Sequence, residues 1–206
     1  MPPVAAKILR LAAAALALLA AVALGAGLWL RGHLRSSLPR LDGAATVPGL
    51  AAAVTVERDD LGMPTIRARD RVDATRALGW LHAQDRFFQM DLLRRAAAGE
   101  LAALAGARAL PRDRQTRRHG FRRIATEVLA RLEPADRALL EAYAAGANAG
   151  LAALGATPWE YLALRATPEP WRPEDTLLVG YSLVLDLQDG TGRYERSLMT
   201  LRDTYG

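Results

Sequence analysis

The fold of this chain is decided by one stretch, Leu78-Gly-Trp-Leu-His-Ala-Gln-Asp-Arg-Phe-Phe-Gln-Met-Asp-Leu-Leu-Arg-Arg95. Near Arg71 the spacing of apolar residues changes from two to about 3.6, which predicts a helix that begins near Asp73 and contains this stretch. One face of the helix is expected to be buried. The apolar residues predicted on that face are Ala74, Leu78, Leu81, Phe88 and Leu92.

Asp85 interrupts this apolar face. An unpaired buried charge is costly, so the carboxylate needs a cationic or hydrogen-bonding partner. Arg86 does not share its face, and the partner should therefore come from another segment. We predict that Asp85 is a structural buried carboxylate in an ion pair that holds the helix against the core. A direct catalytic role is the alternative.

The elements on either side of this helix can also be predicted. Upstream, Ala53–Glu57 and Pro64–Ala68 are short extended runs around turn residues, which is typical of a β-hairpin. Downstream, apolar spacing predicts three helices and proline-rich sequence predicts a loop. The helices cover 121–132, 134–154 and 173–187, the loop covers 158–172, and a short terminal segment begins at 194. The predicted fold class is α+β, mainly α-helical with a short N-terminal β-hairpin.

The N-terminal region has the character of a membrane segment. Lys7 and Arg10 precede an apolar run from Leu11 to Leu30, and a helix needs about 20 apolar residues to cross a bilayer. We predict a signal anchor or transmembrane segment over 1–35, a linker over 36–49 and a compact region over 50–206. A cleaved signal peptide is the alternative. Either interpretation places the compact region outside the cytoplasm, on the periplasmic or extracellular side.

Composition excludes several classes of function. The chain has 206 residues, of which 51% are hydrophobic, so it can bury a core. The formal charge of +5 comes from arginines interspersed with acidic residues, and no recognition motif accompanies them, so we predict no nucleic-acid binding. Cysteine is absent, which excludes disulfides and thiol nucleophiles.

The residues by themselves do not assemble a catalytic centre. Ser182 and Ser197 lack a Gly-x-Ser-x-Gly context. His82 and Asp85 are three residues apart on one helix and could form half of a metal site, although a single helical histidine more commonly packs or caps. Taken alone, these residues describe an exported, mostly helical domain.

Several blocks, in order, give this sequence a family resemblance. The stretch quoted first is similar to the most recognisable block of the penicillin acylase family. Val54–Ala68 resembles the opening strands of that family, and agreement continues through Gly99-Glu-Leu, Tyr143-Ala-Ala-Gly-Ala-Asn148 and Pro170-Trp-Arg-Pro-Glu-Asp175. The order and spacing of the blocks are more specific than any one of them.

The resemblance implies an N-terminal nucleophile hydrolase with an αββα fold. Family precursors cut themselves into an α chain and a β chain, and the new N-terminal serine of the β chain is the nucleophile. Their substrates are acyl amides, including β-lactam side chains and N-acyl homoserine lactones. This chain resembles most of an α chain that stops before the Gly-Ser-Asn cleavage junction, so we expect no catalytic residue here and no activity from this chain alone. The alternative is a membrane-anchored helical interaction protein or a decayed acylase scaffold.

The resemblance also implies two kinds of site residue. Glu195 is similar in position to the one α-chain glutamate that binds a structural calcium, whose other ligands come from the β chain; a surface ion pair is the alternative. Val184 and Gln188 are similar in position to residues that line the acyl pocket, with core packing as the alternative for Val184. No organic cofactor is expected.

Overall fold

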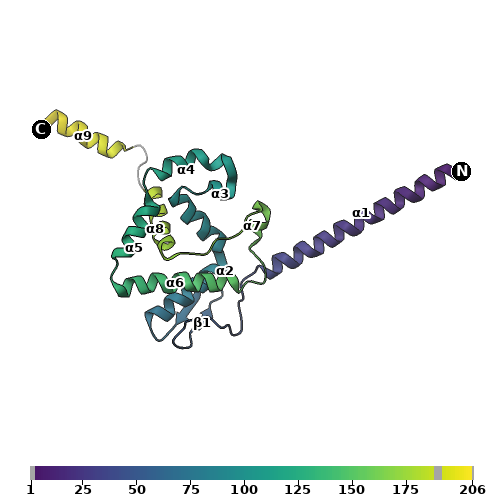
Figure 1. The fold of residues 1–206 in the computed structure, drawn as a ribbon, viewed down its shortest axis with the longest axis horizontal. Helices are drawn as coiled ribbons and strands as arrows, with labels where there is room; N and C mark the ends of the chain where they lie inside the picture. Colours follow the sequence, from purple (N-terminus) through teal and green to yellow (C-terminus); the bar gives the residue numbers. More distant parts are fainter. Residues whose placement is uncertain (1–2, 188–191, 206) are drawn as a thin grey trace.

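A computed structural model describes residues 3–187 and 192–205 of the chain. A helical body carries a long N-terminal helix on one side, and a C-terminal helix extends from the other (Figure 1). The elements, in chain order, are α1 (Pro3–Ser36), β1 (Thr55–Arg58), β2 (Pro64–Arg67), α2 (Arg71–Ala98), α3 (Ala102–Ala105), the 3-10 helix η1 (Gly106–Ala109), α4 (Leu110–Arg117), α5 (Phe121–Arg131), α6 (Pro134–Ala152), α7 (Trp159–Leu164), α8 (Pro173–Leu187) and α9 (Arg193–Tyr205). The predicted mainly helical fold with one hairpin is confirmed.

Helix α2 begins and ends where its sequence dictates. Asp70 precedes it in an extended conformation, and its carboxylate accepts hydrogen bonds from the backbone N–H groups of Val72 and Asp73. At the other end, Gly99 adopts a left-handed φ of 69°, and the N–H of Glu100 donates to the carbonyl oxygen of Arg95. A side chain at Gly99 would bring its Cβ to 2.6 Å from a backbone oxygen of Asp113, so glycine is required there for space as well as conformation.

The core forms around α2, which packs along α6 and also contacts α8. Two glycines of α6 allow the close approach to α2. A Cβ at Gly146 would lie 2.0 Å from the backbone oxygen of Arg76, and one at Gly150 would lie 2.3 Å from that of Trp80. Because these contacts leave no room for a methyl group, the two helix backbones are nearly in contact. The main apolar cluster consists of Ala83, Phe87, Met90, Leu104, Ala144, Ala147, Tyr161 and Trp171.

The predicted buried face of α2 was only partly right. Of its five apolar residues, Leu81 is fully buried and the others are half-buried. The larger buried side chains are instead Trp80, Phe87 and Met90. Two physical reasons account for this difference. Several helices surround α2, so more than one side is covered, and the backbone at Arg86 is non-helical (φ −158°, ψ 35°), so α2 is kinked between its two halves.

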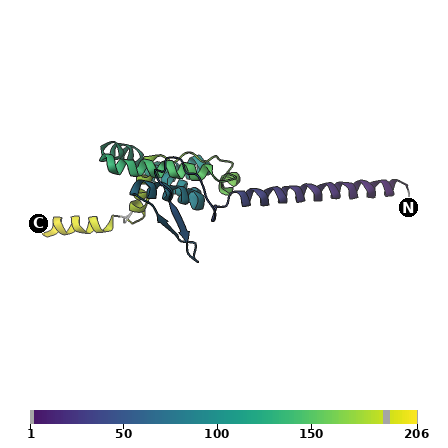
Figure 2. The ribbon, with the colours of Figure 1, turned by 90° about the horizontal axis from the view of Figure 1, so that it is seen from below.

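The predicted hairpin is confirmed, with β1 and β2 antiparallel and Thr55 opposite Arg67. Asp59 shapes the turn, because its carboxylate accepts the N–H groups of Leu61 and Met63 at 3.0 and 2.8 Å. The hairpin projects from the helical body (Figure 2), and Leu61 at its turn is 88% exposed. Within the described residues the sheet has only these two strands, so both outer edges lack a neighbouring strand.

One segment differs from the prediction. The expected loop over 158–172 contains α7, a helix of six residues that is too short to produce a periodic pattern. The terminal segment is also a helix, α9, with no buried residue. The N-terminal region contains the expected apolar helix, long enough to cross a membrane, and none of its apolar window is buried against the body.

Candidate functional site

The start of helix α8 is fixed by a buried carboxylate, Asp175. Arg172 precedes the helix, Pro173 occupies its first position, and the Asp175 carboxylate accepts the backbone N–H of Arg172 at 2.8 Å. A proline at the first position and an acidic group that reaches back from the third are favourable at a helix N-terminus. The side chain of Asp175 is completely buried, so its remaining lone pairs need further donors.

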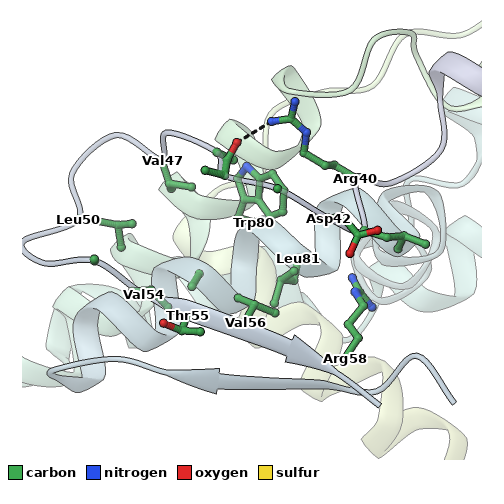
Figure 3. Close-up of a pocket in the computed structure, with 16 residues that line it drawn as sticks. Arg40, Asp42, Val47, Leu50, Val54, Thr55, Val56, Arg58, Trp80 and Leu81 are labelled. Atoms are coloured by element: carbon green, nitrogen blue, oxygen red, sulfur yellow. Dashed lines mark hydrogen bonds between the residues drawn. The ribbon is translucent and has the colours of Figure 1, made fainter. Parts of the chain in front are cut away.

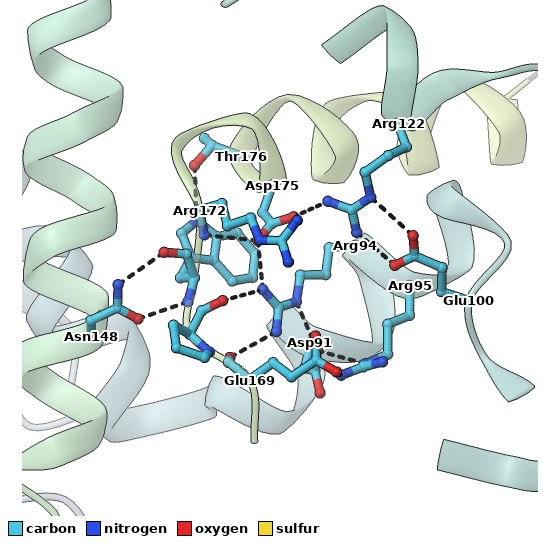
Figure 4. Close-up of polar contacts among 12 residues, drawn as sticks. Asp91, Arg94, Arg95, Glu100, Arg122, Asn148, Glu169, Arg172, Asp175 and Thr176 are labelled. Carbon is cyan, nitrogen blue, oxygen red and sulfur yellow. Dashed lines mark hydrogen bonds and ion pairs between the residues drawn. The ribbon is translucent and has the colours of Figure 1, made fainter. Parts of the chain in front are cut away.

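Two arginines from other helices provide these donors (Figure 4). Arg94 of α2 donates to one oxygen of Asp175 at 2.5 Å, and Arg122 of α5 donates to the other at 2.7 Å. Arg122 also forms a two-pronged ion pair with Glu100 at 3.0 and 2.6 Å. Burial by itself lowers the pKa of Arg122, but hydrogen bonds and charge from Glu100 and Asp175 raise it above the ordinary value. Both arginines therefore remain charged.

Arg94 is the centre of this network. Besides Asp175, it donates to Asp91 at 2.7 Å and to the backbone oxygens of Glu169 and Pro170, each at 2.8 Å. Its guanidinium group also lies over the ring of Trp171, 5.1 Å from the ring centre. Burial acts to lower the pKa of Arg94, but the charges of Asp175 and Asp91 raise it overall. The segment before α8 is thus attached to α2.

Asp91 and Asn148 extend the network to α7 and α6. Asp91 is fully buried and also accepts from Arg95 at 2.8 Å and from the hydroxyl of Tyr161 at 2.7 Å. Asn148 donates to the backbone oxygen of Trp171 at 2.9 Å and accepts its N–H at 2.7 Å. Residues from four of the sequence blocks that resemble the family therefore meet in one place. Their charges are paired and buried, which indicates that the network positions α8 and does not itself react.

Sequence reasoning missed the buried acids of this body. Asp91 and Asp175 are fully buried, as are Asp73 and Asp113, each of which accepts two successive backbone N–H groups. A usable signal existed for Asp91, which has arginines three and four residues later, at the spacing of helical ion pairs. The partners of Asp73 are backbone groups of the segment between α1 and β1, and those of Asp113 are backbone groups at the start of α3, which no side-chain pattern reveals.

Asp85 does find its partner in another segment. Arg58 of β1 donates to both carboxylate oxygens, at 2.9 and 3.0 Å. The carboxylate is not fully buried, however, because 18% of its side chain is exposed. The reason is that its cover is the projecting hairpin and not the helical core. The pair attaches β1 to α2 at the edge of the body.

His82 and Asp85 point to different partners and do not form half of a metal site. His82 Nδ1 lies 2.8 Å from the hydroxyl of Tyr143 on α6, whereas Asp85 is held by Arg58. Within residues 3–187 and 192–205 no group of three potential metal-ligating side chains occurs. Burial, helped by the charge of Arg86, lowers the pKa of His82 below 6.5, and the charge of Asp85 only partly offsets this. Burial also raises the pKa of Tyr143 to about 12.

The lowered pKa of His82 predicts that the stability of the protein depends on pH. Because the folded state lowers the pKa of His82, the unfolded chain binds the proton more readily. The contribution of neutral His82 to the free energy of unfolding is therefore complete above pH 6.5. It is lost as the pH falls from 6.5 through the lower pKa that His82 has in the folded state. Between pH 7 and 5 the intact protein should lose more stability than the His82→Asn variant, as measured by pulse proteolysis. Equal slopes for the two proteins would contradict the prediction.

The other predicted site residues lie at the C-terminal side of the body. Val184 is on α8 and is 48% exposed, between exposed Leu183 and Leu187, so it is not packed in the core. Gln188 lies outside the described residues. Glu195 is exposed on α9. Calcium needs about six to eight oxygen ligands, so the single carboxylate of Glu195 cannot form a calcium site by itself.

A pocket lies elsewhere, between the linker, β1 and α2 (Figure 3). It has a volume of about 440 Å³, and Trp80, Leu81 and Val56 contribute to its apolar lining. Arg40 crosses one side and donates to the backbone oxygen of Ala44 at 2.8 Å. The pocket does not include Val184, and none of its lining side chains combines a nucleophile with a neighbouring base.

Comparisons with known proteins agree with this architecture. A sequence model of the penicillin amidase family matches residues 53–206. Penicillin acylase 2 proenzyme from Pseudomonas sp. (strain SE83) is 44% identical over 149 residues, which are 72% of this chain and 19% of the relative. Acyl-homoserine lactone acylase QuiP from Pseudomonas aeruginosa is 37% identical over 166 residues, 78% of this chain and 20% of the relative.

A solved structure gives the same result. The thermostable penicillin G acylase from Alcaligenes faecalis superimposes with a TM-score of 0.59 and 26% identity, covering 74% of this chain and 82% of that chain. The chain spans about a fifth of the length of the curated relatives that it matches. The family match extends over most of the chain and includes all the residues of the polar network around Arg94 and Asp175. The chain therefore belongs to the penicillin amidase family.

Proposed function

We propose that this chain forms the N-terminal, α-chain part of a self-processing acylase that hydrolyses linear amides. The observation that carries the proposal is the family match over 53–206, together with relatives whose names are those of penicillin and acyl-homoserine lactone acylases. The substrates proposed are accordingly acyl amides such as β-lactam side chains or N-acyl homoserine lactones. Family membership favours an enzyme over a non-catalytic interaction protein.

The proposed partner is a β chain from the same precursor. The matched relatives are about five times as long as their aligned regions, so most of the proposed enzyme is additional polypeptide. Two described surfaces suit such a partner. The hairpin has two open edges, and an isolated two-stranded hairpin is marginally stable in water. The C-terminal part of α8 and helix α9 expose apolar side chains, namely Leu183, Val184, Leu187, Leu198, Met199 and Leu201.

The proposed chemistry is acyl transfer to a serine at the N-terminus of the β chain. The serine hydroxyl attacks the amide carbonyl and passes its proton through the α-amino group to the leaving amine. Hydrogen-bond donors stabilise the tetrahedral oxyanion, and water then releases the acid and frees the serine. No described residue of this chain takes a catalytic role in this scheme. The contribution of the chain is to hold α8 against the site.

Expression of the complete gene tests this proposal. The product should appear as two chains, and the purified protein should release acid and amine from a panel of aliphatic and aromatic amides. A protein that stays in one piece and hydrolyses none of them would support the non-catalytic alternative. Substitution of the new N-terminal serine by alanine is the control, because it should abolish hydrolysis.

Val184 is proposed to line the acyl pocket. Its half-exposed side chain lies in the last turn of α8, and the first turn of that helix is fixed by Asp175. In the complete enzyme, Val184→Phe should lower kcat/KM for long acyl chains about tenfold or more relative to short ones, because pocket volume is lost. The control is Arg137→Gln on α6, which removes an exposed ion pair and should not change the preference. Unchanged preference in Val184→Phe would remove this residue from the pocket.

Calcium binding through Glu195 is proposed as a minor contribution of this chain. The exposed carboxylate can supply one oxygen, and the β chain would supply the others. Glu195→Gln in the complete enzyme should reduce the thermal stabilisation given by added calcium, measured as a smaller shift of Tm. Asp203→Asn, which removes another exposed acid of α9, is the matched control. An equal calcium shift in both variants would argue against Glu195 as a ligand.

Helix α1 is proposed to anchor the enzyme in a membrane, with the body on the periplasmic or extracellular side. Its apolar window has a mean hydropathy of 2.4 and no buried residue. Resistance of the protein to extraction by alkaline carbonate is the expected result. Complete extraction would instead indicate a cleaved leader.

A further inference from the structure

Helix α7 exposes several large apolar side chains, of which Trp159 and Leu162 lie on one face at a spacing of three residues. Trp159 is 52% exposed, Leu162 39% and Leu164 41%, although the helix has only six residues. Arg165 follows as an exposed cation. A large aromatic side chain beside leucines and an arginine is typical of a surface in contact with the interfacial layer of a membrane.

The orientation of α7 is fixed by its other side. Tyr161 is completely buried in the main apolar cluster, where its hydroxyl donates to Asp91 at 2.7 Å. After the helix, Arg165 takes a left-handed conformation and the N–H of Ala166 donates to the carbonyl oxygen of Tyr161 at 2.9 Å. Because Tyr161 is held inside, the side of the helix that carries Trp159 and Leu162 cannot turn into the core.

The end of α1 is attached to the segment just before α7. The N–H of Ala156 donates to the carbonyl oxygen of Ser36 at 3.1 Å, and His33 Nε2 lies 3.0 Å from the carbonyl oxygen of Thr157. Figures 1 and 2, seen from two directions, both show α7 beside the point where α1 meets the body. The position of α7 relative to the proposed membrane span is therefore defined by direct contacts.

The length of α1 places this junction near a bilayer surface. The apolar run Leu11–Leu30 spans about 30 Å at 1.5 Å per residue, the thickness of the hydrocarbon core. Ser36 lies six residues further, about 9 Å beyond that core. The headgroup layer is about 5 to 8 Å thick on each side. Ser36 therefore lies just outside that layer, close enough for long side chains of α7 to extend into it. Arg31 and Arg35, both exposed, lie within the layer.

We infer that α7 rests on the surface of the bilayer that α1 crosses, with Trp159 and Leu162 in the interfacial layer. The inference depends on the membrane anchoring proposed above. A lipid surface fits this face better than the β chain does, because the surfaces suited to the β chain include α9, which projects from the end of the body opposite α1 (Figure 1). The body would then be held on the membrane in one orientation instead of swinging on a tether.

Site-specific fluorescence can test the inference, because residues 1–206 contain no cysteine and any cysteine in the rest of the protein can be replaced by serine. The intact protein carrying Leu162→Cys is labelled with an environment-sensitive fluorophore and placed in phosphatidylcholine and phosphatidylglycerol vesicles, with or without a lipid-borne quencher. The control is Leu61→Cys in the hairpin turn, where the native side chain is 88% exposed. Carbonate extraction of the same samples reports separately whether α1 is inserted.

The inference predicts that the quencher removes at least about half of the emission at position 162 and little at position 61, as expected for a side chain in the interfacial layer. Weak quenching at position 162, with α1 resistant to extraction, would overturn the inference while leaving the anchor intact. Blue-shifted but unquenched emission would indicate cover by protein and also overturn it. Equal quenching at both positions would indicate unspecific adsorption and would overturn the inference. Extraction of the protein by carbonate would overturn both the inference and the proposed anchor.

Discussion

Asp175→Asn is expected to lower the free energy of unfolding by about 3 to 5 kcal/mol, because it leaves two buried or half-buried guanidinium groups without their shared counter-charge. The carboxylate of Asp175 is fully buried and accepts Arg94, Arg122 and the backbone N–H of Arg172. The asparagine amide has nearly the same shape as the carboxylate and can keep part of these hydrogen bonds. It carries no negative charge, however, and it presents an N–H group toward an arginine. The start of α8 should therefore come away from α2 and α5.

Pulse proteolysis of the intact protein measures this loss. Glu127→Gln on α5 is the control, since its pair with Arg123 is solvent-exposed and should contribute less than about 0.5 kcal/mol. In the proposed enzyme, Asp175→Asn should also reduce the yield of processed chains. A loss of stability no greater than that of Glu127→Gln would show that the network does not fix α8.

Gly146→Ala is expected to be similarly damaging for a steric reason. Its Cβ would lie 2.0 Å from the backbone oxygen of Arg76, and neither helix backbone can move without separating α2 from α6. Overpacking of this kind costs about 3 kcal/mol or more, well above the gain of about 1 kcal/mol in helix propensity that alanine brings. The net result should be a strongly reduced midpoint of urea unfolding.

Gly180→Ala makes the same chemical change on α8, where no atom lies within 4 Å of the added Cβ. That variant should be neutral or more stable by up to about 1 kcal/mol. If the two variants had equal stabilities, helix propensity and not close packing would determine the effect of glycine at 146. The pair of variants therefore isolates the steric contribution from the conformational one.

The parts of the fold that could be predicted are those with strong local signals. The hairpin has turn residues between two short β-type runs, and α5, α6 and α8 have regular apolar spacing with prolines at suitable ends. Helix α7 lacks such a signal because it is shorter than two turns. The buried face of α2 was mispredicted because periodicity assumes a straight helix with one covered side, whereas α2 is kinked at Arg86 and surrounded.

The candidate site was less predictable than the fold. Sequence reasoning found that Asp85 needs a distant partner, yet could not identify Arg58, because that contact depends on how the hairpin folds over α2. It did not find Arg94 or Asn148, whose partners are mostly backbone oxygens and carboxylates from segments more than 20 residues away. Long-range polar contacts of this kind leave no regular spacing in the sequence.

Helix α8 is firmly held at one end and exposed at the other. Asp175 is fully buried, whereas Leu187 in the last turn is 73% exposed. Its backbone amides should therefore exchange with deuterated solvent at very different rates, slowly near Leu178 and quickly over the last turn. A helix held in this way can adjust the conformation of its C-terminal turns when another surface covers them. Its N-terminal turns meanwhile keep the same alignment with the rest of the body.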